Sequence, residues 1–199
     1  MMLLLGSHSF YYTSVAEKIR TQLPERSGRM LLIGLAMESD YAPRLLAREV
    51  NAAVMADFER SRITVLDEKD PVAAMQQDYD YITVLGGNTF RLLHFVRKFG
   101  LDHFIPEQVA KGAHYLGFSA GAYLACPDVG YVVGLDENLR ILDGNFRALG
   151  LLDDYVFCHY EEDDRHGGQK LAEIRCRLGR DCTVHPIRLD ELLCFPAKA

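Results

Sequence analysis

Short apolar segments alternate with longer segments of helical periodicity over the first two-thirds of the chain. The apolar segments are rich in Leu, Ile and Val, as in strands that are buried on both faces of a sheet. They predict strands at residues 2–7, 30–36, 63–67, 80–87 and 113–119. Apolar residues spaced three to four apart predict helices at 14–23, 41–60, 70–78, 88–100, 104–112 and 120–126. This alternation predicts an α/β fold, a doubly wound, mostly parallel sheet with helices on both faces.

The pattern changes after Cys126. Residues 129–146 are typical of short strands and turns, and a strand follows at 155–160. A glycine-led helix is predicted at 165–179 and a last strand at 187–195. The 199 residues, 49% of them hydrophobic, are enough for one sizeable core and favour a single α/β domain over residues 1–199.

A serine stands where a strand is predicted to meet a helix. The segment GFSAG (117–121) fits the pattern G-x-S-x-G, with a strand before it and a helix after it. In such a nucleophile elbow the serine backbone is strained, and glycines two positions away let strand and helix approach without a clash. We therefore expect Ser119 to lie at the carboxyl edge of the sheet, where open α/β sheets bind their ligands.

A second glycine pair ends the preceding predicted strand, in VLGGNTF (84–90). The backbone amides of Gly86 and Gly87 are predicted to lie at the same sheet edge, and with that of Ala120 they would form an oxyanion hole. Asn88 or Thr89 suits a helix N-cap, and Asn88 also stands where it would face a substrate. GGNT is neither G-x-G-x-x-G nor a Walker motif, so no nucleotide site is indicated.

A nucleophilic serine requires a base, and seven histidines are available. His159 is the first choice, since it ends a predicted strand downstream of the elbow, and His8 is the second. For the acid, the sequence leaves three residues open: Glu161, two positions past His159, and Asp190 and Glu191 near the last strand.

Composition narrows the classes of partner. The net charge is −6 and no basic stripe with interleaved aromatic residues is present, so nucleic acid is not expected. No segment approaches the roughly 20 apolar residues of a membrane helix. The five cysteines form no CxxC pair, so zinc-ligand spacing is absent and no metal is expected, and reduced thiols indicate a cytoplasmic location. A homodimer is left open.

Three pieces together resemble a known family. GGNTFRLL, GFSAGA and a later histidine before a glycine-containing polar stretch resemble the peptidase E (aspartyl dipeptidase) family of serine peptidases, relatives of cyanophycinase. The resemblance covers about residues 30 to 195. It implies a flavodoxin-like fold related to class I glutamine amidotransferases, and cofactor-free cleavage of small peptides by a Ser-His-acid triad. It places the nucleophile on Ser119, the base on His159 and the acid on Glu191.

The chain departs from the family pattern in two places. Aspartyl dipeptidases have an arginine after the histidine that holds the acidic side chain of the substrate. Here the matching stretch offers Lys170 or Arg175, with Leu171 near the matching position, so a strict aspartyl preference is not expected. The chain also ends at Ala199, where relatives continue into another hairpin, so its C-terminus is short for the family.

Serine peptidase action on dipeptides or short peptides is thus the first functional hypothesis. Glutamine amidotransferase chemistry is a second, because His159 and Glu161 form an H-x-E, but Cys158 stands beside the histidine and not at the elbow. A third is a catalytically weak or inactive binding or sensor protein that keeps the elbow.

Overall fold

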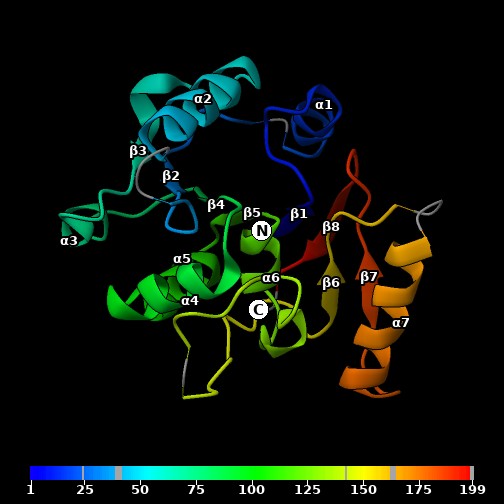
Figure 1. Cartoon of the computed structure of the whole chain (residues 1–199). Coiled ribbons are helices and arrows are strands. Elements are labelled where there is room, and N and C mark those ends of the chain that lie inside the picture. Colours follow the sequence, from blue (N-terminus) through cyan, green and yellow to red (C-terminus); the bar gives the residue numbers. More distant parts are fainter. Residues whose placement is uncertain (24, 39–41, 142, 162–164, 198–199) are drawn as a thin grey trace.

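The central sheet has six strands in the order β3-β2-β4-β5-β1-β8 (Figure 1). The computed structural model describes all residues except 24, 39–41, 142, 162–164 and 198–199. The strands are β1 (Met2–Gly6), β2 (Met30–Ile33), β3 (Ile63–Val65), β4 (Tyr81–Val84), β5 (His114–Phe118) and β8 (Leu192–Pro196). The first five run parallel and β8 pairs antiparallel with β1, which confirms the mostly parallel sheet.

Helices cover both faces of this sheet (Figure 1). They are α1 (Thr13–Gln22), α2 (Ala42–Met55), α3 (Pro71–Ala74), α4 (Thr89–Lys98), α5 (Leu101–Ala110) and α6 (Ala120–Leu124). Successive strand residues point to opposite faces, so Leu4 packs in one core with α1 and α2, and Leu3 and Leu5 pack in the other with α4, α5 and α6. Near-continuous apolar strands are the sequence signature of such a two-sided core.

Two predicted helices are shorter than their patterns indicate. The helix predicted at 41–60 ends at Met55, because the chain turns at Asp57 with a φ of 71°. The helix predicted at 70–78 is the single turn α3, which Asp70 caps by accepting a hydrogen bond from the Ala73 amide at 3.2 Å.

The prediction of short strands at 129–146 was wrong. This segment holds a 3-10 helix, Gly130–Val132, and an isolated bridge between Val133 and Asp136. Its backbone hydrogen bonds are mostly short-range turn bonds, such as that from the Leu135 amide to the Val132 carbonyl at 2.9 Å, so no strand ladder forms within the described part.

A small second sheet follows. Strands β6 (Tyr155–Phe157) and β7 (Val184–Pro186) pair in parallel beside α7 (Arg165–Leu178). Strand β7 was not predicted, and the strand predicted at 187–195 begins only at Leu192. The carboxyl end of β6 reaches the main sheet edge, since the His159 amide donates to the hydroxyl of Ser7, directly after β1, at 2.9 Å.

Candidate active site

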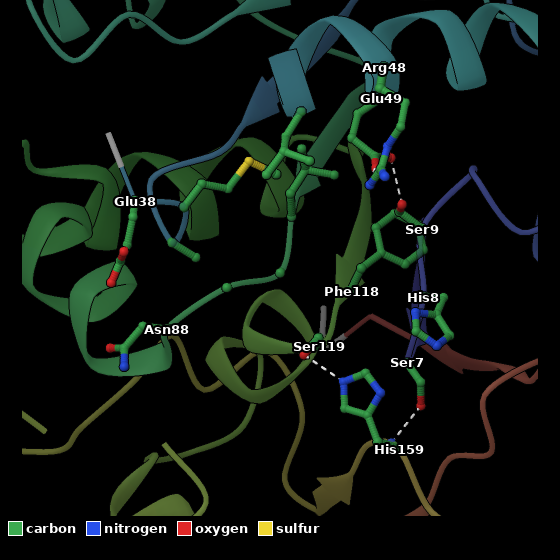
Figure 2. Close-up of a pocket in the computed structure, with 16 residues that line it drawn as sticks. Ser7, His8, Ser9, Glu38, Arg48, Glu49, Asn88, Phe118, Ser119 and His159 are labelled. Atoms are coloured by element: carbon green, nitrogen blue, oxygen red, sulfur yellow. Dashed lines mark hydrogen bonds and ion pairs between the residues drawn. The ribbon is translucent and has the colours of Figure 1, made fainter. Parts of the chain in front are cut away.

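A pocket of about 430 Å³ opens where the parallel strands end. Loops after β1, β2, β4 and β5 contribute to its walls, as do the carboxyl end of β6 and one face of α2 (Figure 2). The residues that line it include the predicted site residues Gly86, Gly87, Asn88, Ser119 and His159, together with Ser7 and His8. The topology thus brings the predicted nucleophile and base into one cavity.

Ser119 has the backbone of a nucleophile elbow. Its φ is 52° and its ψ is −110°, a conformation that residues with a side chain rarely adopt. The Ser119 amide donates to the Gly6 carbonyl at 2.9 Å, and the Ser119 carbonyl accepts from the amides of Ala122 and Tyr123 at 2.9 and 3.0 Å. Bonds on both sides of the turn therefore fix the strained residue between strand and helix.

The glycines around Ser119 are required by space. A β-carbon at Gly121 would lie 2.1 Å from the Val84 carbonyl oxygen, and one at Gly117 would lie 2.6 Å from the Gly121 oxygen. A β-carbon at Gly86 would lie 3.0 Å from that of Ser119. The strand, the elbow helix and the Gly86 loop thus meet closer than any side chain allows.

His159 reaches the serine directly. Its Nε2 lies 2.9 Å from Ser119 Oγ, within hydrogen-bond distance (Figure 2). The His159 backbone is also left-handed, with φ of 60°. Its amide donates to Ser7 Oγ at 2.9 Å, and the Ser7 hydroxyl donates to the Ile187 carbonyl at 2.9 Å. Ser7, 2% exposed, therefore connects the base to the main sheet.

Buried tyrosines tie the elbow helix to the histidine strand. The Tyr123 hydroxyl, on α6, accepts from the Cys158 amide at 3.2 Å, directly before His159. The Tyr131 hydroxyl donates to the Val156 carbonyl on β6 at 2.8 Å. Burial raises the pKa of Tyr123 well above its ordinary value, so this phenol stays neutral.

The His159 imidazole is tuned toward its neutral form. Partial desolvation lowers its pKa, and the charge that His8 can carry lowers it further, whereas Asp136 opposes both. The rings of His8 and His159 lie 5.2 Å apart, edge to face, and His8 stacks on Tyr12 at 3.9 Å. Within the described residues Ser119 Oγ bonds to His159, so His8 is its neighbour in the pocket and not its partner.

None of the three carboxylates considered for the acid makes a hydrogen bond or ion pair with His159 among the described residues. Glu191 accepts from the Arg188 amide at 3.1 Å, the Asp190 carbonyl accepts from Lys18 Nζ at 2.9 Å, and Glu161 is exposed. The ion pairs found among the described residues include none between His159 and a carboxylate. The neighbouring acids 162–164 lie outside the described residues.

Asp136, which the sequence analysis missed, acts on the site by its charge although its side chain does not line the pocket. Its carboxylate raises the pKa of His159 and accepts from the Thr89 amide, at the start of α4, at 2.8 Å. No motif marks it, because it lies in the irregular segment 129–146 and meets the site only through the fold.

The Gly86–Asn88 loop lines the pocket beside Ser119. Gly87 has φ of 139°, and a β-carbon there would lie 2.3 Å from the Ala36 oxygen. No hydrogen bond found between described residues uses the amide of Gly86 or Gly87. The Asn88 side chain is already engaged: its Oδ1 accepts from the Arg91 amide at 2.8 Å and its Nδ2 donates to the Glu137 carbonyl at 2.9 Å.

The residues matched to the family's substrate arginine do not line the pocket. Arg175 donates to the Val184 carbonyl at 3.5 Å and Leu171 is buried in the core. Burial raises the pKa of the Cys158 thiol well above its ordinary value, which disfavours a thiolate nucleophile.

Neither a metal site nor a membrane helix appears in the described part of the chain. No three His, Cys, Asp or Glu side chains there gather closely enough to hold a metal ion. No helix among the described residues combines the length and apolarity needed to cross a bilayer.

Comparisons with known proteins bear on this arrangement. The profile of Peptidase family S51 matches residues 2–193. An uncharacterized peptidase of Listeria innocua is 38% identical over 92 residues, which are 46% of this chain and 44% of that protein. Peptidase E of Citrobacter koseri is 40% identical over 110 residues, or 55% of this chain and 46% of that protein. The aligned part is thus less than half the length of these curated relatives.

A crystal structure of a Listeria monocytogenes protein, provisionally described as Peptidase E, matches with a TM-score of 0.71. The match covers 99% of this chain and 98% of that one, at 23% sequence identity. It confirms the predicted fold.

Proposed function

The chain belongs to peptidase family S51, and from this premise we propose that it is a serine peptidase that hydrolyses dipeptides or short peptides. The observation that carries the proposal is the 2.9 Å contact between Ser119 Oγ and His159 Nε2 at a strained elbow. A hydroxyl held beside a neutral imidazole is the arrangement that nucleophilic catalysis needs.

The reaction would proceed in two steps. Ser119 Oγ attacks the peptide carbonyl carbon while its proton passes to His159 Nε2, and the backbone amides of Gly86, Gly87 and Ala120 would stabilise the alkoxide. The C–N bond then breaks as Nε2 returns the proton to the leaving amine, which leaves an ester on Ser119. Water, deprotonated by His159, attacks this ester, and the acid product leaves as Ser119 recovers its proton.

The acid of the triad is proposed at Glu191, on the resemblance of residues 189–191 to the family's late acidic motif. Glu191 directly precedes β8, whose Leu192 pairs with Gly6, so it lies at the same sheet edge as Ser7. Asp136 is the second candidate, because its charge acts on the imidazole. Glu191→Gln and Asp136→Asn separate the two: the variant of the true acid should lose on the order of 10²–10⁴ in kcat.

A labelling experiment tests the nucleophile. A fluorophosphonate probe should label the parent protein and a Ser14→Ala control, whose serine lies outside the pocket, but not Ser119→Ala. The parent protein should hydrolyse members of a dipeptide panel, and Ser119→Ala should retain only a small fraction of that rate. Equal labelling or equal hydrolysis by Ser119→Ala would refute the assignment, and a folded parent that neither reacts nor hydrolyses would favour the non-catalytic alternative.

A further inference from the structure

The pocket ends in a buried carboxylate that the proposed mechanism does not use. Glu49, on α2, lines the same cavity as Ser119 and His159 and is only 2% exposed. Figure 2 shows Glu49 with Ser9 at one end of the pocket and the Ser119–His159 pair at the other. Because glutamate is almost never fully buried without a partner, its contacts decide what it can bind.

Glu49 has one inner partner and one outer partner. The Ser9 hydroxyl donates to its Oε2 at 2.5 Å, and Arg48 Nη2 lies 3.0 Å from its Oε1. The Arg48 side chain is 47% exposed, against 3% for Glu49, and its guanidinium also stacks on the Tyr11 ring at 4.3 Å. Ser9 therefore fixes the carboxylate, whereas Arg48 neutralises it from the solvent side and can turn away.

The wall between the two ends of the pocket is largely apolar. Its side chains come from the β2 and β4 loops, from α2 and from the end of β5: Ala36, Met37, Leu45, Leu85 and Phe118. Such a wall can accept methylene groups but offers them no hydrogen bond. A ligand that spans this cavity from Ser119 to Glu49 thus contacts both apolar surface and a carboxylate.

The charges of the pocket favour a cation. Glu38 and Glu49 supply two carboxylates against the single guanidinium of Arg48. Desolvation lowers the pKa of both His8 and His159, so neither ring adds a full positive charge near neutral pH. An acidic substrate side chain would therefore enter an electronegative cavity and leave its charge poorly compensated.

We infer that this pocket receives the residue on the amino side of the cleaved bond and selects a long cationic side chain, lysine or arginine. The methylene stem would lie along the apolar wall, and the ammonium or guanidinium would bind Glu49 in place of Arg48. The inference rests on the proposed peptidase function and names its substrate class. A charge-assisted hydrogen bond in a desolvated site discriminates strongly against an uncharged analogue.

Matched dipeptides test this inference. The parent protein is assayed on lysyl-leucine, norleucyl-leucine and aspartyl-leucine, where norleucine has an uncharged stem of nearly the length of lysine. We expect kcat/KM for the lysyl peptide to exceed that for the norleucyl peptide by about 10- to 100-fold, and aspartyl-leucine to be the poorest. Glu49→Gln should abolish the lysyl preference and keep norleucyl hydrolysis, whereas Glu107→Gln, on α5 outside the pocket, should change neither.

Other outcomes would overturn the inference. Equal losses on lysyl and norleucyl peptides in Glu49→Gln would mean that Glu49 holds the α-ammonium or only the fold. A preference for aspartyl-leucine that Arg48→Met removes would assign recognition to Arg48. Should Glu49→Gln fail to fold, the lysyl-to-norleucyl ratio of the parent decides. Norleucyl hydrolysis that depends on Ser119 but shows no lysyl preference refutes this subsite alone, whereas hydrolysis unchanged in Ser119→Ala refutes the proposed function.

Discussion

Ser119 and His159 lie in two turns that share an unusual backbone conformation. The two turns are stabilised by different kinds of contact. Both residues have side chains and positive φ, 52° and 60°. The Ser119 turn is enclosed by backbone on several sides, since glycines at 117 and 121 allow contacts too close for any β-carbon. The His159 turn is held by hydrogen bonds to the hydroxyls of Ser7 and Tyr123, the first of them 152 residues away in the chain.

Close packing at the Ser119 turn and hydrogen bonding at the His159 turn should respond differently to substitution. Close backbone packing cannot relax without moving a strand, so the elbow is stiff and cannot accommodate added side-chain atoms. A hydrogen bond from a backbone amide to the hydroxyl of a distant residue can break without moving a strand, but it sets the direction of the imidazole to a fraction of an ångström. We therefore expect damage at the elbow to appear mainly as lost stability, and damage at the histidine turn mainly as lost catalysis.

The largest expected effect is that of Gly121→Ala. The added methyl group would lie 2.1 Å from the Val84 carbonyl oxygen, so β4 and α6 must separate. We expect the free energy of unfolding to fall by about 3 kcal/mol, measured by urea denaturation, with activity lost as well. Gly168→Ala is the matched control, since nothing lies within 4 Å of its β-carbon position on α7, and alanine there should raise stability by up to about 1 kcal/mol. Equal stability of the two variants would contradict steric locking of the elbow.

Ser7→Ala tests the histidine turn. It removes the acceptor of the partly buried His159 amide and the donor to the buried Ile187 carbonyl, at a cost of about 1–3 kcal/mol in unfolding free energy. Because the ring would lose its alignment with Ser119, kcat should fall on the order of 10² with KM nearly unchanged.

Two further measurements separate positioning from simple destabilisation in Ser7→Ala. The pKa of His159, followed by NMR, should change along with kcat. Thr21→Ala, which removes an exposed hydroxyl that donates within α1 to Glu17, should change neither. A Ser7→Ala protein with lower stability but full kcat would show that Ser7 supports the fold and not the base.

The same contrast explains what the sequence could predict. The elbow is local: strand, glycines, serine and helix are contiguous around GFSAG, so the order of residues alone was enough to predict the turn. The parallel sheet followed likewise from the apolar strands, and His159 from the end of one of them. Ser7 was predicted only as the end of a strand, because its partners at 159 and 187 are set by how β6 meets β1.

Asp136 and Glu49 escaped prediction for a related reason. Asp136 lies in an irregular segment without periodicity and approaches the site through the start of α4. Glu49 is one charged residue within a helical pattern, where a solvent-facing position is the usual outcome, yet α2 turns it into the pocket. Tertiary packing decides such positions, and periodicity alone does not report it.

A smaller effect is expected from Tyr123→Phe. The change leaves the Cys158 amide without its hydroxyl acceptor but keeps the ring packed between α6 and β6. Unfolding free energy should fall by about 1 kcal/mol and kcat should fall less than in Ser7→Ala, because the bond lies one residue before His159. Thermal unfolding measures the change in stability, and steady-state kinetics measure the change in kcat. A kcat loss larger than that of Ser7→Ala would mean that the Tyr123 hydroxyl contributes more than Ser7 to the position of His159.

The smallest effect should be a shift in pH dependence. The pKa of His159 is lowered from 6.5 by desolvation and by His8, so the neutral base, and with it kcat/KM, should persist below pH 6.5 and fall at lower pH. The folded state then binds fewer protons than the unfolded chain between the lowered pKa and 6.5, so stability should also decline as pH falls through that window. His8→Gln removes a like charge 5.2 Å from the ring and should move the acid limb of kcat/KM to higher pH, whereas His103→Gln, 91% exposed on α5, should not. If the acid limb stays fixed in His8→Gln, desolvation alone sets the pKa of the base, and the histidine turn tunes its own imidazole by burial, just as the elbow fixes its serine by packing.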